Sequence, residues 1–72
     1  MPRLITAKEV THRFEMVEGT HSKFWEYKRV GKDFLASWGK IGKRPQGNKM
    51  YPEGEITRLV GEKLKKGYEK VS

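Results

Sequence analysis

The chain has 72 residues, no cysteine, and a formal net charge of +7 from 16 basic and 9 acidic side chains. A chain this short forms one domain with a small core, and the absence of cysteine excludes disulfides and thiolate metal sites. It contains neither the apolar stretch of a signal peptide nor the roughly 20 apolar residues of a membrane-spanning helix. We therefore expect a soluble, monomeric, cytoplasmic protein that does not bind membranes, with anionic partners favoured by its charge.

The pattern of apolar and polar residues predicts the elements of the first 50 residues in chain order. Residues 1–9 lack clear periodicity and are expected to form a flexible leader. Alternation of apolar and polar residues then predicts strands in 10–17 and 23–30, and a third in 34–38 after a tight turn at 30–33. A short fourth strand is expected in 48–51, ended by Pro52. Antiparallel strands therefore occupy about residues 10–50.

The apolar period changes to 3.6 residues at Glu53, which predicts a helix over 53–66. Acidic residues near its start and lysines near its end complement the helix dipole, and Gly67 suits the left-handed residue after the last turn. The economical fold is α+β: one domain over 1–72, with a small antiparallel sheet of about four strands covered on one face by a single C-terminal helix. The apolar stripe of this helix comprises Ile56, Leu59, Val60 and Leu64. Its cations, interpreted as dipole complements and solubilising groups, are Lys63, Lys65, Lys66 and, beyond it, Lys70.

The sequence offers no catalytic constellation. His21, Ser22 and Asp33 are the residue types of a hydrolytic triad, but adjacent residues of an extended segment point to opposite faces. Two histidines without cysteine do not propose a zinc site, and "GKIGKR" lacks the spacing of a phosphate loop. We therefore expect no enzymatic activity, no metal and no cofactor.

The middle of the chain carries most of the positive charge. Residues 20–50 hold eight basic side chains against only Glu26 and Asp33, which accounts for +6 of the total +7. This excess is either a solvated cationic loop or a site for an anion, since unbalanced charges repel one another unless an anion lies nearby.

Trp38 in "SWGKIGK" has two possible roles. It shares strand parity with Phe34 and Ala36, which favours a core position, whereas Gly39 permits a bulge or a close backbone approach, and a bulge would turn Trp38 outward. Trp25, in the middle of the second strand beside Tyr27, is expected in the core.

The order of motifs resembles that of a WGR domain over roughly residues 12–71. These motifs are "KFWEY", a turn containing Gly31, "SWGKIGK", a polar loop and a helix ending "EKLKKGYEKV". The WGR family is named for a Trp-Gly-Arg signature and is found in DNA-damage-responsive poly(ADP-ribose) polymerases, in proteins similar to the bacterial molybdate metabolism regulator and in stand-alone bacterial proteins. The resemblance implies an antiparallel sheet with one packed helix, and binding of DNA near a strand break.

The resemblance also implies which residues bind. The signature tryptophan, which stacks on the sugar of a terminal nucleotide in the polymerases, is Trp38, and the signature glycine is Gly39. Lys40 replaces the signature arginine, so that charge is kept but the planar guanidinium fork is lost. Ser22 stands where the family often has asparagine. The expected nucleic-acid-binding residues are Trp38, Gly39, Lys40, Lys43, Arg44, Lys49 and Lys23.

We therefore expect a non-catalytic module that binds DNA ends, nicks or junctions through backbone contacts and tryptophan stacking, without sequence specificity, and that resides at the nucleoid. The alternative is a protein interaction module in which the same basic patch binds an acidic protein or a neighbouring domain. A third reading is RNA binding, which an aromatic, basic sheet also permits. Competition between broken and intact duplex separates the first reading from the second.

Overall fold

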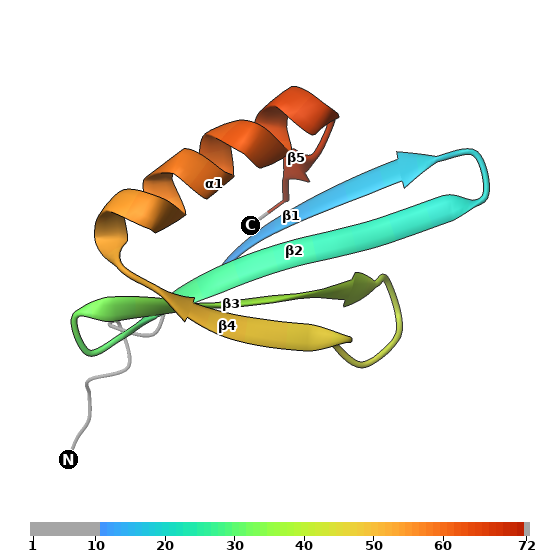
Figure 1. Ribbon diagram of the computed structural model, residues 1–72. Coiled ribbons are helices and arrows are strands. Elements are labelled where there is room, and N and C mark those ends of the chain that lie inside the picture. Colours follow the sequence, from blue (N-terminus) through green and yellow to red (C-terminus); the bar gives the residue numbers. More distant parts are fainter. Residues whose placement is uncertain (1–10, 72) are drawn as a thin grey trace, which may run out of the picture.

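Five antiparallel strands and one helix make up residues 11–71, the part of the chain that the computed structural model describes (Figure 1). The strands are β1 (Thr11–Glu18), β2 (His21–Val30), β3 (Asp33–Lys40), β4 (Gly47–Tyr51) and β5 (Glu69–Lys70), and α1 (Glu53–Lys66) lies between the last two in sequence. Their order in the sheet is β4-β3-β2-β1-β5. The fold is thus of the α+β class. The leader expected at residues 1–9 lies outside the described residues.

The first four strands form a meander because short turns separate them. Gly19 and Gly31 begin the turns after β1 and β2, with φ angles of 62° and 66°. Glycine adopts this left-handed conformation at no steric cost, which suits two-residue hairpin loops. The hairpins therefore have a fixed register, with Phe14 opposite Trp25 and Trp25 opposite Trp38.

The expectation of about four strands is wrong by one, because β5 follows the helix and pairs with β1. Lys70 lies opposite Phe14, and the Val71 backbone N–H donates a hydrogen bond to the Arg13 carbonyl oxygen at 2.8 Å. β5 has only two residues, both exposed, so no alternation of apolar and polar side chains marks it in the sequence. β5 directly follows Tyr68, which is buried in the core cluster, so its pairing with β1 is a tertiary contact and not a local one.

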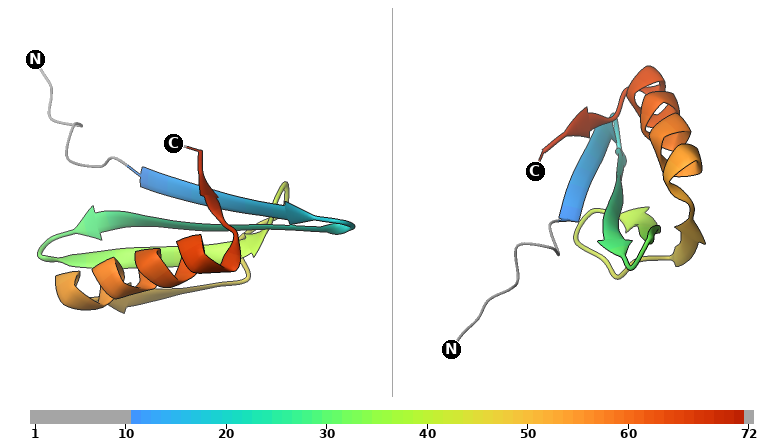
Figure 2. Two further views of the ribbon diagram at one scale, coloured as in Figure 1. Left: turned by 90° about the horizontal axis from the view of Figure 1, so that it is seen from above. Right: turned by 90° about the vertical axis from the view of Figure 1, so that its left-hand side faces the viewer.

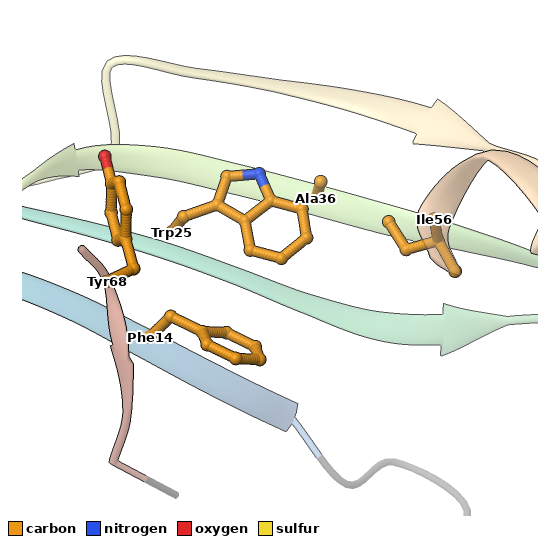
Figure 3. Close-up of a cluster of buried hydrophobic side chains, with 5 residues drawn as sticks. All are labelled: Phe14, Trp25, Ala36, Ile56 and Tyr68. Atoms are coloured by element: carbon orange, nitrogen blue, oxygen red, sulfur yellow. The ribbon is translucent and has the colours of Figure 1, made fainter. Parts of the chain in front are cut away.

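The core lies at the junction of sheet and helix (Figure 3). Phe14 and Trp25 contribute adjacent rings whose centroids are 5.7 Å apart. Ala36 is fully buried, and its small side chain leaves room for larger neighbours in the same cluster. Ile56 brings α1 into this cluster, and Tyr68 brings in the segment that leads to β5. Figure 2 shows α1 running along one side of the sheet.

The other face of the sheet holds a separate cluster built on Phe24, which is buried outside the main core. The Arg13 guanidinium lies 4.3 Å above the Phe24 ring. It donates hydrogen bonds to the carboxylates of Glu15 at 2.8 Å and Glu26 at 2.9 Å, which raises the pKa of Arg13, mainly through Glu15. The positive charge of Arg13 is thereby paired with the two carboxylates.

The apolar stripe of α1 is buried unevenly. Ile56 is 3% exposed, whereas Leu64, two turns later on the same stripe, is 51% exposed and lies outside the core cluster. Leu59 and Val60 are partly buried against the core. The helix is therefore anchored to the sheet at its N-terminal half.

This difference predicts unequal effects of truncation on stability. We expect Ile56→Ala to lower the free energy of unfolding by about 2–5 kcal/mol, because it removes buried methylene groups and leaves a cavity. Leu64→Ala should change it by less than about 1 kcal/mol, because its side chain is largely in water already. Urea unfolding followed by circular dichroism measures both, and equal losses would contradict the anchoring of α1 through Ile56.

Candidate nucleic-acid interface

A pocket of about 440 Å³ opens where β2 begins and β3 ends. We call it the basic pocket and define it by six of its lining residues: Lys23, Trp38, Lys40, Lys43, Lys63 and Tyr68. It is large enough for a nucleoside-sized ligand, since small-molecule sites span about 300–1,000 Å³.

Strand register brings two of the lysines together. Lys23 on β2 lies directly opposite Lys40 on β3, and the next pair on the same face is Trp25 and Trp38. Like charges directly opposite each other on neighbouring strands destabilise a sheet. A bound anion would remove this repulsion.

The acidic side chains nearby do not neutralise these lysines. None of the residues that line the pocket in the described part of the chain is aspartate or glutamate. Glu15 and Glu26 are bonded to Arg13 on the other face, and Glu55 and Glu62 are bonded to Arg58 on α1. Within residues 11–71 these ion pairs lie outside the pocket, and no carboxylate of its lining balances the charge of its lysines.

Trp38 is partly buried, and its indole lies across the backbone of β4. Gly47 is its partner in β4, and a Cβ atom at Gly47 would come within 2.8 Å of indole Cζ2. Trp38 packs against the core cluster and also lines the basic pocket. Trp38 thus contributes both to the packing of the core cluster and to the wall of the pocket.

The bulge considered at Gly39 is absent, because the pairing of β3 with β2 runs without interruption through Trp38, Gly39 and Lys40. Gly39 instead permits a close backbone approach: a Cβ atom there would lie 3.1–3.2 Å from backbone atoms of residues 44–46. The Gln46 N–H donates a 2.7 Å hydrogen bond to the Trp38 carbonyl oxygen. The lack of a side chain at Gly39 thus allows the loop between β3 and β4 to lie close to the end of β3.

Lys63 is a pocket residue that the sequence interpretation missed. Its Nζ lies 5.3 Å from the Tyr68 ring centroid and 5.8 Å from that of Trp25. Burial lowers the pKa of Lys63, and the positive charges of Lys66 and Lys23 lower it further, against an opposing effect of Glu62. The spacing of Lys63 in the sequence could have indicated this position, since Lys63 follows Ile56 by seven residues and so falls on the apolar face of α1.

Two of the expected binding residues lie outside the pocket. Arg44 is exposed in the loop between β3 and β4. Lys49 lies on β4 opposite Ala36, with Nζ 5.3 Å from the Tyr51 ring centroid. The structure therefore brings together Lys23, Trp38, Gly39, Lys40 and Lys43, but not Arg44 or Lys49.

The residue types of a hydrolytic triad do not meet. His21 and Ser22 line the pocket, whereas Asp33 begins β3 at the opposite end of that strand. Within residues 11–71 there is also no group of His, Asp or Glu side chains that could hold a metal ion. No helix in that range is long and apolar enough to cross a membrane.

Neither a protein-family model nor a curated protein matches this chain. The fold is similar to the crystal structure of a protein from Bacteroides fragilis, with a TM-score of 0.76 and 26% sequence identity. The similarity covers 88% of this chain and 20% of that one. The chain thus spans about a fifth of the length of the Bacteroides protein, in which the same fold forms one part of a longer polypeptide.

The contact between Gly47 and Trp38 predicts a specific sensitivity. Gly47→Ala should lower the free energy of unfolding by about 1–3 kcal/mol, because the new methyl group overlaps the indole. Gly61→Ala is the matched control: nothing lies within 4 Å of its Cβ position, and alanine in a helix interior should raise stability by about 0.5–1 kcal/mol. Thermal and urea unfolding test both signs, and a neutral Gly47→Ala would show that the indole is free to move.

Proposed function

We propose that this chain is a non-catalytic DNA-binding module of the WGR type, which binds ends, nicks or junctions without reading sequence. The observation that carries the proposal is the basic pocket: a partly exposed Trp38 beside three lysines of the sheet and its loop, with no acidic residue in the lining. The order of motifs and the single helix that follows the strands agree with this assignment.

The lysines supply the attraction to DNA. Lys23 and Lys40 repel each other across the β2–β3 pair, and a phosphate between them replaces that repulsion with two attractions. Lys43 follows in the loop and bonds through its N–H to the Lys40 carbonyl oxygen at 3.0 Å, so that the two residues stay close. Arg44 and Lys49 extend the positive surface beyond the pocket along the DNA backbone.

Trp38 supplies the preference for breaks. In an intact duplex, each base is covered by its neighbours, whereas an end or a nick leaves a sugar and a base face open for contact. The backbone at Gly47 packs against the indole of Trp38, which fixes the orientation of the exposed surface of the ring. Stacking of this kind contributes about 1–3 kcal/mol for each base.

The outer surface of α1 does not favour sequence readout. Arg58 is the only arginine of the helix, and its guanidinium donates hydrogen bonds to Glu55 at 3.0 Å and to Glu62 at 2.6 Å. Base recognition in the major groove relies on side chains such as arginine, asparagine and glutamine that are free to reach base edges. Binding through phosphates and stacking is therefore expected to be similar for different sequences.

The first test concerns Trp38. Wild type should bind a nicked duplex more tightly than the intact duplex of the same sequence, and Trp38→Ala should weaken binding to the nicked duplex by about 5- to 150-fold. Fluorescence anisotropy of labelled duplexes measures both, with circular dichroism to show that the variant is folded. Leu35→Ala, a truncation on the opposite face of β3, serves as the control.

Equal binding to nicked and intact duplex, unchanged by Trp38→Ala, would overturn the role of the tryptophan. No binding to either duplex would overturn the proposal as a whole and point to an acidic protein partner. A single-stranded RNA of the same length, used as a competitor, tests the third reading.

The second test concerns charge. Neutralisation of three to five phosphates gives a slope of log K against log salt concentration of about −3 to −4.5, and loss of one contact reduces its magnitude by about 0.9. Lys23→Ala should show this reduction. Lys32→Ala removes the same charge from the turn at the other end of β2 and should leave the slope in place. Equal effects of the two substitutions would mean that net charge, and not the pocket, governs binding.

A further inference from the structure

Lys63 differs from the other lysines of the basic pocket in its surroundings. It comes from α1, not from the sheet or its loop, and the rings of Trp25 and Tyr68 flank its amine. Both distances lie within the limit of about 6 Å for cation–π attraction, and the two rings cover part of the Lys63 side chain. No ion pair involving Lys63 is found among the described residues, and the adjacent Glu62 is bonded to Arg58.

The charged groups around Lys63 lower its pKa on balance. Lys66 on its own helix and Lys23 on β2 both lower its pKa in addition to burial, and only Glu62 acts in the other direction. Lys40, Lys43 and His21 also line the pocket. For each unit by which the pKa of a lysine falls, its neutral and nucleophilic fraction rises about tenfold at neutral pH.

We propose that Lys63 is a nucleophilic amine that captures the aldehyde of an abasic site in DNA held in the basic pocket. This inference rests on the proposed DNA binding and adds a covalent step to it. An abasic site is chemically suited to the pocket, because its deoxyribose has lost the base, opens to an aldehyde at C1′ and is flanked by phosphates. The volume of about 440 Å³ accommodates a sugar with a phosphate beside Trp38.

The step balances without any further reactant. The lone pair of neutral Nζ attacks C1′ of the open-chain sugar; the nitrogen then loses one proton and the aldehyde oxygen takes one up, which gives a carbinolamine. The hydroxyl group leaves with a second proton as water, and loss of the remaining proton from nitrogen leaves a neutral imine between Nζ and C1′. Addition of water reverses the reaction, so the capture is temporary and returns the lysine and the DNA unchanged.

The experiment is reductive trapping. Full-length protein is incubated with a duplex that carries one abasic site next to a nick, and sodium borohydride reduces any imine to a stable secondary amine. The covalent complex is quantified by denaturing electrophoresis, and peptide mass spectrometry locates the modified lysine. A duplex with the tetrahydrofuran analogue, which has no aldehyde, reports binding alone by anisotropy.

We expect a covalent complex with the abasic duplex and none with the tetrahydrofuran duplex, with the modification on Lys63. Lys63→Arg keeps the charge but cannot form the imine, and it should reduce trapping about tenfold or more. Lys65→Arg, an exposed lysine of the same helix, is the matched control and should trap as wild type does.

Two results would overturn this inference. Binding to the tetrahydrofuran duplex without trapping of the abasic one would refute capture while leaving the proposed DNA binding intact. Trapping spread over many lysines, or reduced equally by Lys63→Arg and Lys65→Arg, would show indiscriminate reaction. Failure of the protein to bind either duplex would instead refute the proposed function from which the inference starts, and the inference with it.

Discussion

The pairing register of β2 with β3 is the constraint on which both the core and the basic pocket depend. It sets Trp25 opposite Trp38 and, one pair further on the same face, Lys23 opposite Lys40. A slip of β3 by one residue would move Trp38 and Lys40 to the other face, away from Trp25 and Lys23, because strand side chains alternate. Packing of Trp25 against Trp38 stabilises the register. This stabilisation offsets the repulsion between Lys23 and Lys40, which the same register places opposite each other.

The charges of the domain are divided between two kinds of environment. Arg13 and Arg58 each bind two carboxylates, and these pairs lie on the other face of the sheet and on the outer surface of the helix. The lysines of the basic pocket have no such carboxylates in the lining. Because of this separation, the net charge of +7 produces a positive potential at the pocket. The same number of cations spread among acidic partners would create no local potential.

Much of the architecture could be predicted from the sequence because it is encoded locally. Alternating residues around Phe14 and Trp25 indicate the strands, and the change of period at Glu53 indicates the helix. β5 and the role of Gly47 could not be predicted in this way, since each depends on a contact between strands, with the distant β1 in the first case and with the Trp38 side chain on β3 in the second. Lys63 lies in the last turn of α1, where the sequence predicted a complement to the helix dipole, but its place in the pocket was missed because the spacing from Ile56, which puts it on the apolar face, was not used.

The pairing of β5 with β1 has a consequence for the order in which the chain folds. The meander of β1 to β4 closes through short turns and needs only contacts between neighbouring segments, which form quickly. The contact between Phe14 and Lys70 instead closes a loop that spans nearly all of the described chain, and it becomes favourable only when α1 has brought Tyr68 onto the core. We therefore expect the pocket wall formed by α1 to be completed late, after the strands that carry Lys23 and Lys40 are already paired.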